Sequence, residues 1–128
     1  MSKLSKVGFG LAIGLTLAAM SGSAFAQDAA AGEKSFKKYC GMCHTTEAGK
    51  NRVGPSLNGV VGRTSGSVAG FAYSVANKNS GITWTEDKLD AYLSGPATAT
   101  VPGTKMTFGG IKDTAERANV IAYLKTQK

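Results

Sequence analysis

Histidine and cysteine are almost absent from this sequence, whose 128 residues include one histidine, His44, and two cysteines, Cys40 and Cys43. Two cysteines allow a single disulfide, and one between neighbours this close would constrain the unfolded chain little. A zinc site needs about four ligands, so zinc here would require a carboxylate or a second chain. A redox Cys-x-x-Cys of the thioredoxin kind is expected beside a strand-helix-strand pattern, which this sequence lacks.

Long apolar runs are also missing. The uncharged stretch at residues 7–20 has 14 residues, whereas a membrane-spanning helix needs roughly 20. Lys3 and Lys6 precede this stretch and the small-x-small pattern Ala24-Phe25-Ala26 follows it, which is typical of a secretory signal peptide. We therefore expect cleavage of residues 1–26, no stable membrane insertion, and one small periplasmic domain over residues 27–128.

Acidic residues are few, with eight Asp and Glu against 15 Lys and Arg. All eight acids and 13 of the basic residues lie in residues 27–128, so this part carries a formal charge of 13 − 8 = +5. A basic balance permits an acidic partner without naming one. Nucleic acid is not expected, because an exported protein meets little of it and no nucleic-acid-binding signature is present.

Strand signals are short, and the periodic segments are helical. The pattern predicts a helix over residues 28–39, a brief one within residues 72–78, one capped by Thr85 and stopped at Gly95-Pro96, and one starting at Asp113 with a capping box to Glu116. Glycine-rich loops join them. The expected fold class is therefore all-α, with long loops of the kind that usually serve function.

One chemistry uses all three scarce residues of "CGMCH". In a Cys-x-x-Cys-His segment the two thiols add across the vinyl groups of a haem, and the adjacent imidazole lies beneath the iron as its ligand. We therefore predict covalent haem c bound through Cys40 and Cys43, with His44 as a metal ligand. The haem would also supply the apolar centre that a 102-residue, loop-rich domain lacks.

The ligand on the other face of the iron decides the function, since an open position allows gas binding or peroxide chemistry, whereas two protein ligands favour electron transfer. Met1 and Met20 leave with the signal peptide, and Met42 is fixed between the cysteines. Met106 remains, in the loop "VPGTKMTFGG". It is the predicted second metal ligand, although most methionines fill gaps in cores, and Lys105 is a local rival.

From residue 32 to residue 124 the chain resembles the class I c-type cytochromes, the family of mitochondrial cytochrome c and its soluble periplasmic bacterial counterparts. The blocks that carry the resemblance are "CGMCH", "GPSLNGVVGR", "GFAYS", "ANKN", "GITWTEDKLDAYL", "VPGTKMTF" and "GIKDTAERANVIAYLK" in this order. The resemblance implies that the N- and C-terminal helices pack across each other, with Gly32 and Phe36 near Tyr123 and Leu124.

The resemblance also implies roles for further residues. The Pro55 carbonyl is expected to accept a hydrogen bond from His44. Tyr73, Trp84 and Arg63 are expected at a buried haem propionate. The remaining expected cofactor contacts are Asn77, Tyr92 and Thr104 on the methionine side, with Phe108 near the haem edge.

The sequence thus predicts a soluble, monomeric one-electron carrier rather than an enzyme. Its expected partners are a membrane quinol-cytochrome c reductase and a terminal oxidase, a photosynthetic reaction centre or a periplasmic reductase. Docking is expected through basic residues near the haem, namely Lys37, Lys38, Lys50, Lys105 and Lys112. The alternative is a haem enzyme or gas-binding haem protein with an open sixth coordination site.

Overall fold

The computed structural model describes Gly10 and residues 27–128, so the expected signal peptide lies, apart from Gly10, outside the described residues. The described part is all-α, as predicted. Its helices are α1 (Ala29–Tyr39), α2 (Val75–Asn79), α3 (Glu86–Ser94), α4 (Ala97–Thr100) and α5 (Thr114–Lys125). The only strand-like pairing within these residues is an isolated antiparallel bridge between Thr64 and Thr83.

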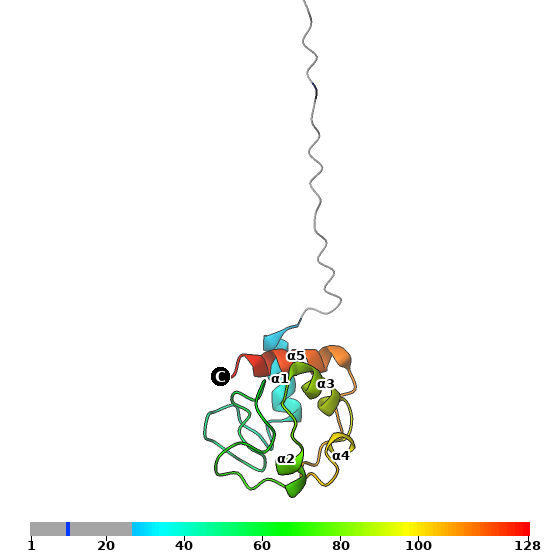
Figure 1. Cartoon of the computed structure of the whole chain (residues 1–128). Coiled ribbons are helices and arrows are strands. Elements are labelled where there is room, and N and C mark those ends of the chain that lie inside the picture. The colour runs from blue at the N-terminus through cyan, green and yellow to red at the C-terminus, as the bar shows by residue number, and fades with distance from the viewer. Residues whose placement is uncertain (1–9, 11–26) are drawn as a thin grey trace, which may run out of the picture.

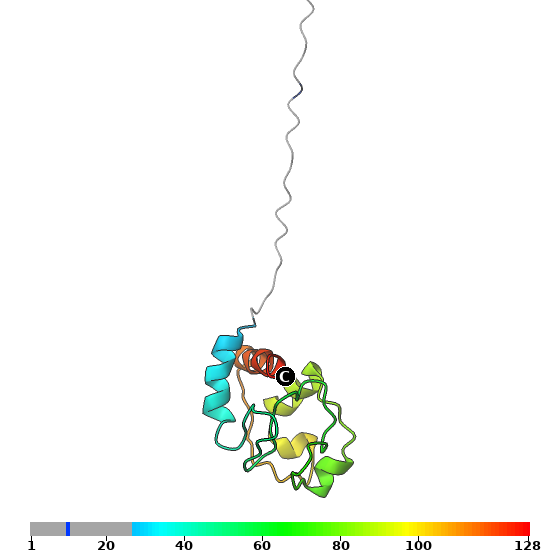
Figure 2. The ribbon, with the colours of Figure 1, turned by 90° about the vertical axis from the view of Figure 1, so that its left-hand side faces the viewer.

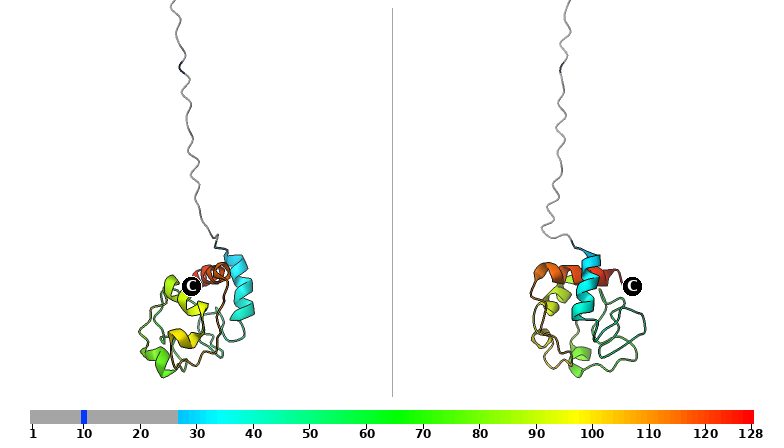
Figure 3. Two further views of the ribbon diagram at one scale, coloured as in Figure 1. Left: turned by 90° about the vertical axis from the view of Figure 1, so that its right-hand side faces the viewer. Right: turned by 180° about the vertical axis from the view of Figure 1, so that it is seen from behind.

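The first and last helices cross each other at one end of the domain (Figures 1 and 3). Asp28 caps α1 by accepting a hydrogen bond from the Ala31 backbone N–H. At the crossing a side chain on Gly32 would collide with the backbone of α5, because its Cβ would lie 1.9 Å from the Asn119 carbonyl oxygen. The rings of Phe36 and Tyr123 pack with centroids 5.4 Å apart. The predicted contact between the terminal helices is confirmed.

Helix α3 follows the predicted pattern closely. The Thr85 hydroxyl accepts from the Lys88 backbone N–H at its start, and Gly95 ends it. Its buried residues are Leu89, Tyr92 and Leu93, the spacing that marks one helical face. The single turn of α4, which begins directly after Pro96, was not predicted, because four residues of alanine and threonine carry no helical periodicity.

The start of α5 differs from the prediction in one contact. Asp113 caps the helix by accepting from the Glu116 backbone N–H at 2.9 Å. The Glu116 carboxylate, however, accepts from Ser35 at 2.9 Å and from Tyr39 at 3.3 Å, both on α1. The capping box is therefore only half formed, because Glu116 links the two crossed helices instead.

Loops form most of the rest of the domain. They lie on one side of the crossed helices, together with α2, α3 and α4 (Figure 2). The buried apolar cluster draws on α1, α3 and α5 and on loop residues such as Val60, Val101 and Ile111. No helix in residues 27–128 has the length and apolar character required to cross a membrane.

Candidate functional site

A single cavity gathers all the side chains that the sequence analysis predicted to bind the cofactor or its metal. Its walls are mainly apolar and come from the segment after α1, the long loop before α3, α3 itself, the loop before α5, and α5. The predicted site residues that line it are Cys40, Cys43, His44, Pro55, Arg63, Tyr73, Asn77, Trp84, Tyr92, Thr104 and Met106, together with Phe108.

The His44 ring is held in one orientation. Its Nδ1 lies 2.7 Å from the Pro55 carbonyl oxygen, and since a carbonyl only accepts, Nδ1 carries the proton and Nε2 keeps its lone pair. Gly54 packs against the ring so closely that an added Cβ would lie 2.2 Å from His44 Cε1. Burial lowers the pKa of His44, the Pro55 hydrogen bond opposes this shift, and the Arg63 charge adds to it. The imidazole is therefore neutral at neutral pH, the form that binds a metal.

The two cysteines differ in exposure. Cys40 is buried and Cys43 exposed. Burial, with a smaller effect of Cys43, raises the pKa of the Cys40 thiol to about 11. Redox-active cysteines have lowered pKa values, because the thiolate is the nucleophile. Cys40 therefore lacks the electrostatics of a thioredoxin-like nucleophile.

Met106 lies in a hydrogen-bonded network inside the cavity. The Tyr92 hydroxyl donates to Met106 Sδ at 3.0 Å, and the Met106 backbone N–H donates to the Thr104 hydroxyl at 3.2 Å. Thr104 in turn donates to Asn77 Oδ1 at 2.7 Å, and so does Ser74 at 2.8 Å. Hydrogen bonds therefore hold Met106 at two points, its backbone N–H and its thioether sulfur.

The opposite polar group of the cavity centres on Arg63. Its Nη1 donates to the carbonyls of Ser56 and Asn58 at 2.9 and 3.0 Å. Its Nε is buried and has no hydrogen-bond partner among the described residues. Nearby, the Tyr73 hydroxyl accepts from the Val68 backbone N–H at 3.0 Å, which leaves the phenolic proton to be donated elsewhere.

Comparison with known proteins shows the family of the chain. Residues 29–128 match the family model described as cytochrome c. The chain is 53% identical to cytochrome c2 of Blastochloris viridis over 123 residues, covering 95% of this chain and 93% of the relative. It is 50% identical to cytochrome c of Euglena viridis, covering 79% and 98%. The solved structure of cytochrome cH from Methylobacterium extorquens superposes with a TM-score of 0.72 at 50% identity, covering 77% of this chain and 98% of that one.

The chain belongs to the cytochrome c family. Members of this family are electron carriers rather than enzymes, and their cofactor is haem c, for which Cys40 and Cys43 stand at the spacing that covalent attachment requires. The predicted fold, family and cofactor are confirmed.

The residues present fit a haem on two observations of this structure. An unpartnered buried Arg63 Nε calls for an acceptor, and a haem propionate is an anionic one. The cradle around His44, with Gly54 directly against the ring, leaves Nε2 as the nitrogen with a lone pair for a metal. A bound haem would meet the first with a propionate carboxylate and the second with its iron.

Sequence reasoning missed one buried charged residue. Arg117 is 8% exposed and lies on the same face of α5 as Val120, Ile121 and Leu124. An arginine in an apolar stripe at helical spacing is a signal visible in the sequence, since a buried guanidinium must find partners.

The lysines expected to serve docking are all exposed, but they are not equivalent. Lys37 pairs with Glu33 at 3.1 Å and Lys50 with Glu47 at 3.2 Å. Lys38 lies over the Tyr39 ring, and Lys105 lines the cavity. Of these five lysines, Lys105 is therefore the one that lines the cavity expected to hold the cofactor.

Proposed function

We propose that this chain is a periplasmic carrier of single electrons whose haem iron is ligated by His44 and Met106. The observation that carries the proposal is that one cavity contains both a histidine with Nε2 left to bind metal and a thioether held by Tyr92 and Thr104. A haem c bound there supplies a reversible Fe(III)/Fe(II) couple, and histidine-methionine ligation favours the reduced form.

The chain's own residues prepare the site for that role. The Pro55 carbonyl fixes the His44 tautomer and raises the basicity of Nε2. Tyr92 orients the Met106 sulfur through its hydroxyl hydrogen bond. Arg63 and Tyr73 offer hydrogen-bond donors to a propionate, and the buried Trp84 packs against Tyr92 with ring centroids 4.7 Å apart. With His44 and Met106 both bound to the iron, no substrate would need to reach the metal.

Acid-acetone extraction and spectroscopy of the purified protein test the proposal. The haem should remain with the protein in acid-acetone, and the ferric spectrum should be low-spin with the weak long-wavelength band of sulfur-to-iron ligation. Met106→Leu should abolish that band and lower the reduction potential. Met42→Leu is the matched control, since Met42 is the other methionine of residues 27–128 and is 86% exposed. A high-spin ferric wild-type protein would instead support the open-site alternative.

We further propose that residues 1–26 are removed on export. The charged start, apolar run and small-x-small pattern support this. The intact mass of the protein purified from the periplasm tests it, and the expected mass is that of residues 27–128 plus one haem. A cytoplasmic protein that retains these residues would contradict it.

The proposed partners are a membrane quinol-cytochrome c reductase as donor and a terminal oxidase, reaction centre or periplasmic reductase as acceptor. The net charge of +5 on residues 27–128 supports docking on acidic surfaces. We propose that the carrier is monomeric, with its exposed lysines serving transient contacts rather than a stable assembly. Sedimentation of the purified protein tests this, and a stable dimer would contradict it.

A further inference from the structure

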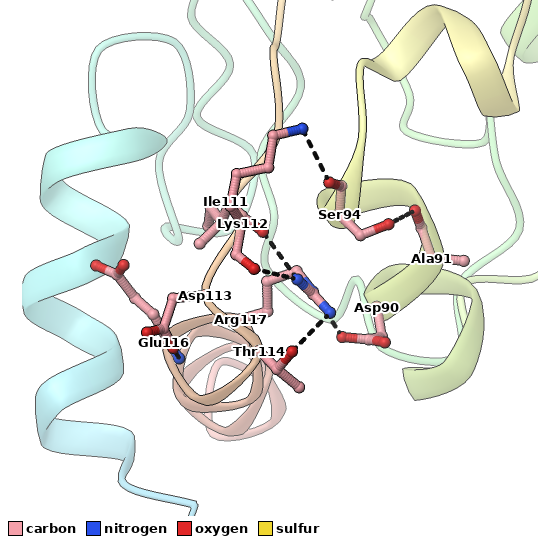
Figure 4. Close-up of polar contacts among 9 residues, drawn as sticks. All are labelled: Asp90, Ala91, Ser94, Ile111, Lys112, Asp113, Thr114, Glu116 and Arg117. Atoms are coloured by element: carbon pink, nitrogen blue, oxygen red, sulfur yellow. Dashed lines mark hydrogen bonds and ion pairs between the residues drawn. The ribbon is translucent and has the colours of Figure 1, made fainter.

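Arg117 joins three parts of the fold through one guanidinium group (Figure 4). From α5, its Nε donates to Asp90 Oδ1 on α3 at 2.9 Å. Its Nη1 donates to the carbonyls of Ile111 and Lys112 at 2.9 and 3.2 Å. Nη2 lies 3.5 Å from the Thr114 hydroxyl. We call Arg117, Asp90 and the two carbonyls the Arg117 clasp.

The carbonyls in the clasp belong to the end of the segment that carries Met106. Met106 lies in the loop between α4 and α5, and the clasp holds this loop five residues later, at Ile111. Ile111 is 1% exposed, and its N–H donates to the Leu93 carbonyl of α3 at 2.7 Å. Gly110 lies so close to α3 that an added Cβ would be 2.9 Å from the Ser94 carbonyl oxygen. The C-terminal end of the Met106 loop, at Gly110 and Ile111, therefore packs against the C-terminal end of α3.

Helix α3 is also the helix that holds the Met106 sulfur. Tyr92, two residues after Asp90, donates its hydroxyl to Met106 Sδ. The distance between the Tyr92 hydroxyl and the Met106 backbone thus depends on how firmly the loop end is fixed to α3. Arg117 bonds both sides of that junction, Asp90 on the helix and Ile111 on the loop.

Arginine suits this task better than any other side chain, because its planar group presents five N–H donors in a fixed geometry. The side chain of Arg117 is 10% exposed, whereas that of Asp90 is 47% exposed. Loss of the Asp90 charge would leave a buried cation without its counter-ion. Movement of the guanidinium toward water would then lower its solvation free energy, and it would break the hydrogen bonds to the Ile111 and Lys112 carbonyls.

We propose that Arg117 and Asp90 are positioning residues for Met106, which they serve by fastening the end of its loop to α3. This rests on the proposed ligation of iron by Met106. A positioning role differs from general structural support, because it predicts easier displacement of Met106 from the iron, whereas loss of an ion pair that joins the same helices without touching the loop should leave that displacement unchanged.

The chain offers a matched control for the test. Lys125 and Glu86 form a second ion pair between α5 and α3, with Nζ and Oε1 3.2 Å apart. This pair joins the same two helices without a hydrogen bond to the Met106 loop. Asp90→Asn and Glu86→Gln each remove one carboxylate charge and preserve side-chain shape. A difference between the two variants therefore reports the hydrogen bonds from Arg117 to the Met106 loop, which Lys125 does not make.

The experiment measures how readily added imidazole displaces Met106 from ferric haem in the holoprotein. Displacement requires the loop to open, so the apparent imidazole affinity reports that opening. Asp90→Asn should tighten imidazole binding about fivefold and speed hydrogen exchange at the Ile111 amide by a similar factor. Glu86→Gln should change neither.

The results separate the clasp from the proposed function. A wild-type spectrum without sulfur ligation would overturn the ligation by Met106 itself. With that ligation present, an Asp90→Asn effect below about threefold, or an equal effect of Glu86→Gln, would each overturn the clasp. Arg117→Lys provides a second variant, since one ammonium cannot reproduce the planar fork, and it should move imidazole binding in the same direction.

Discussion

Gly54 shows at the scale of a single residue how the cavity limits the sequence. Its backbone packs against the face of the His44 ring, and an added Cβ would lie 2.2 Å from Cε1 and 2.7 Å from Nδ1. Something must move if a side chain is present, and the ring is already tied to the neighbouring Pro55 carbonyl. The glycine is thus required by the ring position rather than by backbone conformation.

We therefore expect Gly54→Ala to destabilise the holoprotein by about 1–3 kcal/mol, the usual cost of overpacking. Urea unfolding followed by the haem absorption band measures this. Gly95→Ala is the control, because nothing lies within 4 Å of an added Cβ there, and it should change stability by no more than about 0.5 kcal/mol. Equal losses in the two variants would show that His44 is not held by this contact.

At the scale of an element, the crossing of α1 and α5 depends on Gly32. A Cβ at this position would lie 1.9 Å from the Asn119 carbonyl oxygen and 3.0 Å from Tyr123 Cβ. Both neighbours belong to the facing helix, and the first is backbone, so the helices would have to separate. Separation would weaken the Phe36–Tyr123 packing and the contacts of Glu116 with α1.

Gly32→Ala accordingly sets two effects against each other. Alanine is favoured over glycine inside a helix by about 1 kcal/mol, whereas forcing the helices apart costs about 1–3 kcal/mol or more. We expect the clash to win and the urea midpoint to fall. A rise in the midpoint would mean that the crossing tolerates a methyl group. Lys34→Ala, at an exposed position of the same helix, is the control and should change the midpoint little.

The helices with periodic patterns or caps were predictable, and a brief helix was also expected near α2 (Val75–Asn79), whereas α4 was not predicted. Asp28, Thr85 and Asp113 cap the helices that the sequence indicated. The turn of α4 lacked such a pattern. Glu116 was assigned to its own helix because a capping box is a local motif, whereas its actual partners, Ser35 and Tyr39, lie 81 and 77 residues away.

At the scale of the whole molecule, the same division between local and distant information applies to the site. Haem attachment could be predicted from "CGMCH" alone, because attachment chemistry fixes the spacing of its residues. The placement of Arg63, Tyr73 and Trp84 on one cavity followed only from resemblance to a family, since no local pattern links them. The Arg117 clasp was missed because Asp90, 27 positions earlier, becomes its partner only after folding.

Charge is the other property of the whole molecule, and it leads to a prediction about docking. With a net charge of +5 over residues 27–128, electron transfer to an acidic partner should slow as ionic strength rises, because salt screens the attraction that speeds encounter. Stopped-flow rates measured between roughly 10 and 300 mM salt, where the Debye length falls from about 30 Å to below 8 Å, provide the check. A rate independent of salt would exclude electrostatic docking.

The position of each lysine should affect the electron-transfer rate as well as the net charge does, because the electric field acts most strongly where the partner approaches. Lys105 lines the cavity, whereas Lys125 is bound to Glu86 on α3 and does not. Lys105→Gln and Lys125→Gln each change the net charge by one unit, yet we expect the first to slow the low-salt reaction severalfold and the second much less. At high salt the two variants should converge on the wild-type rate. Equal slowing by both would mean that net charge alone steers the encounter and that the mouth of the cavity has no special part in it.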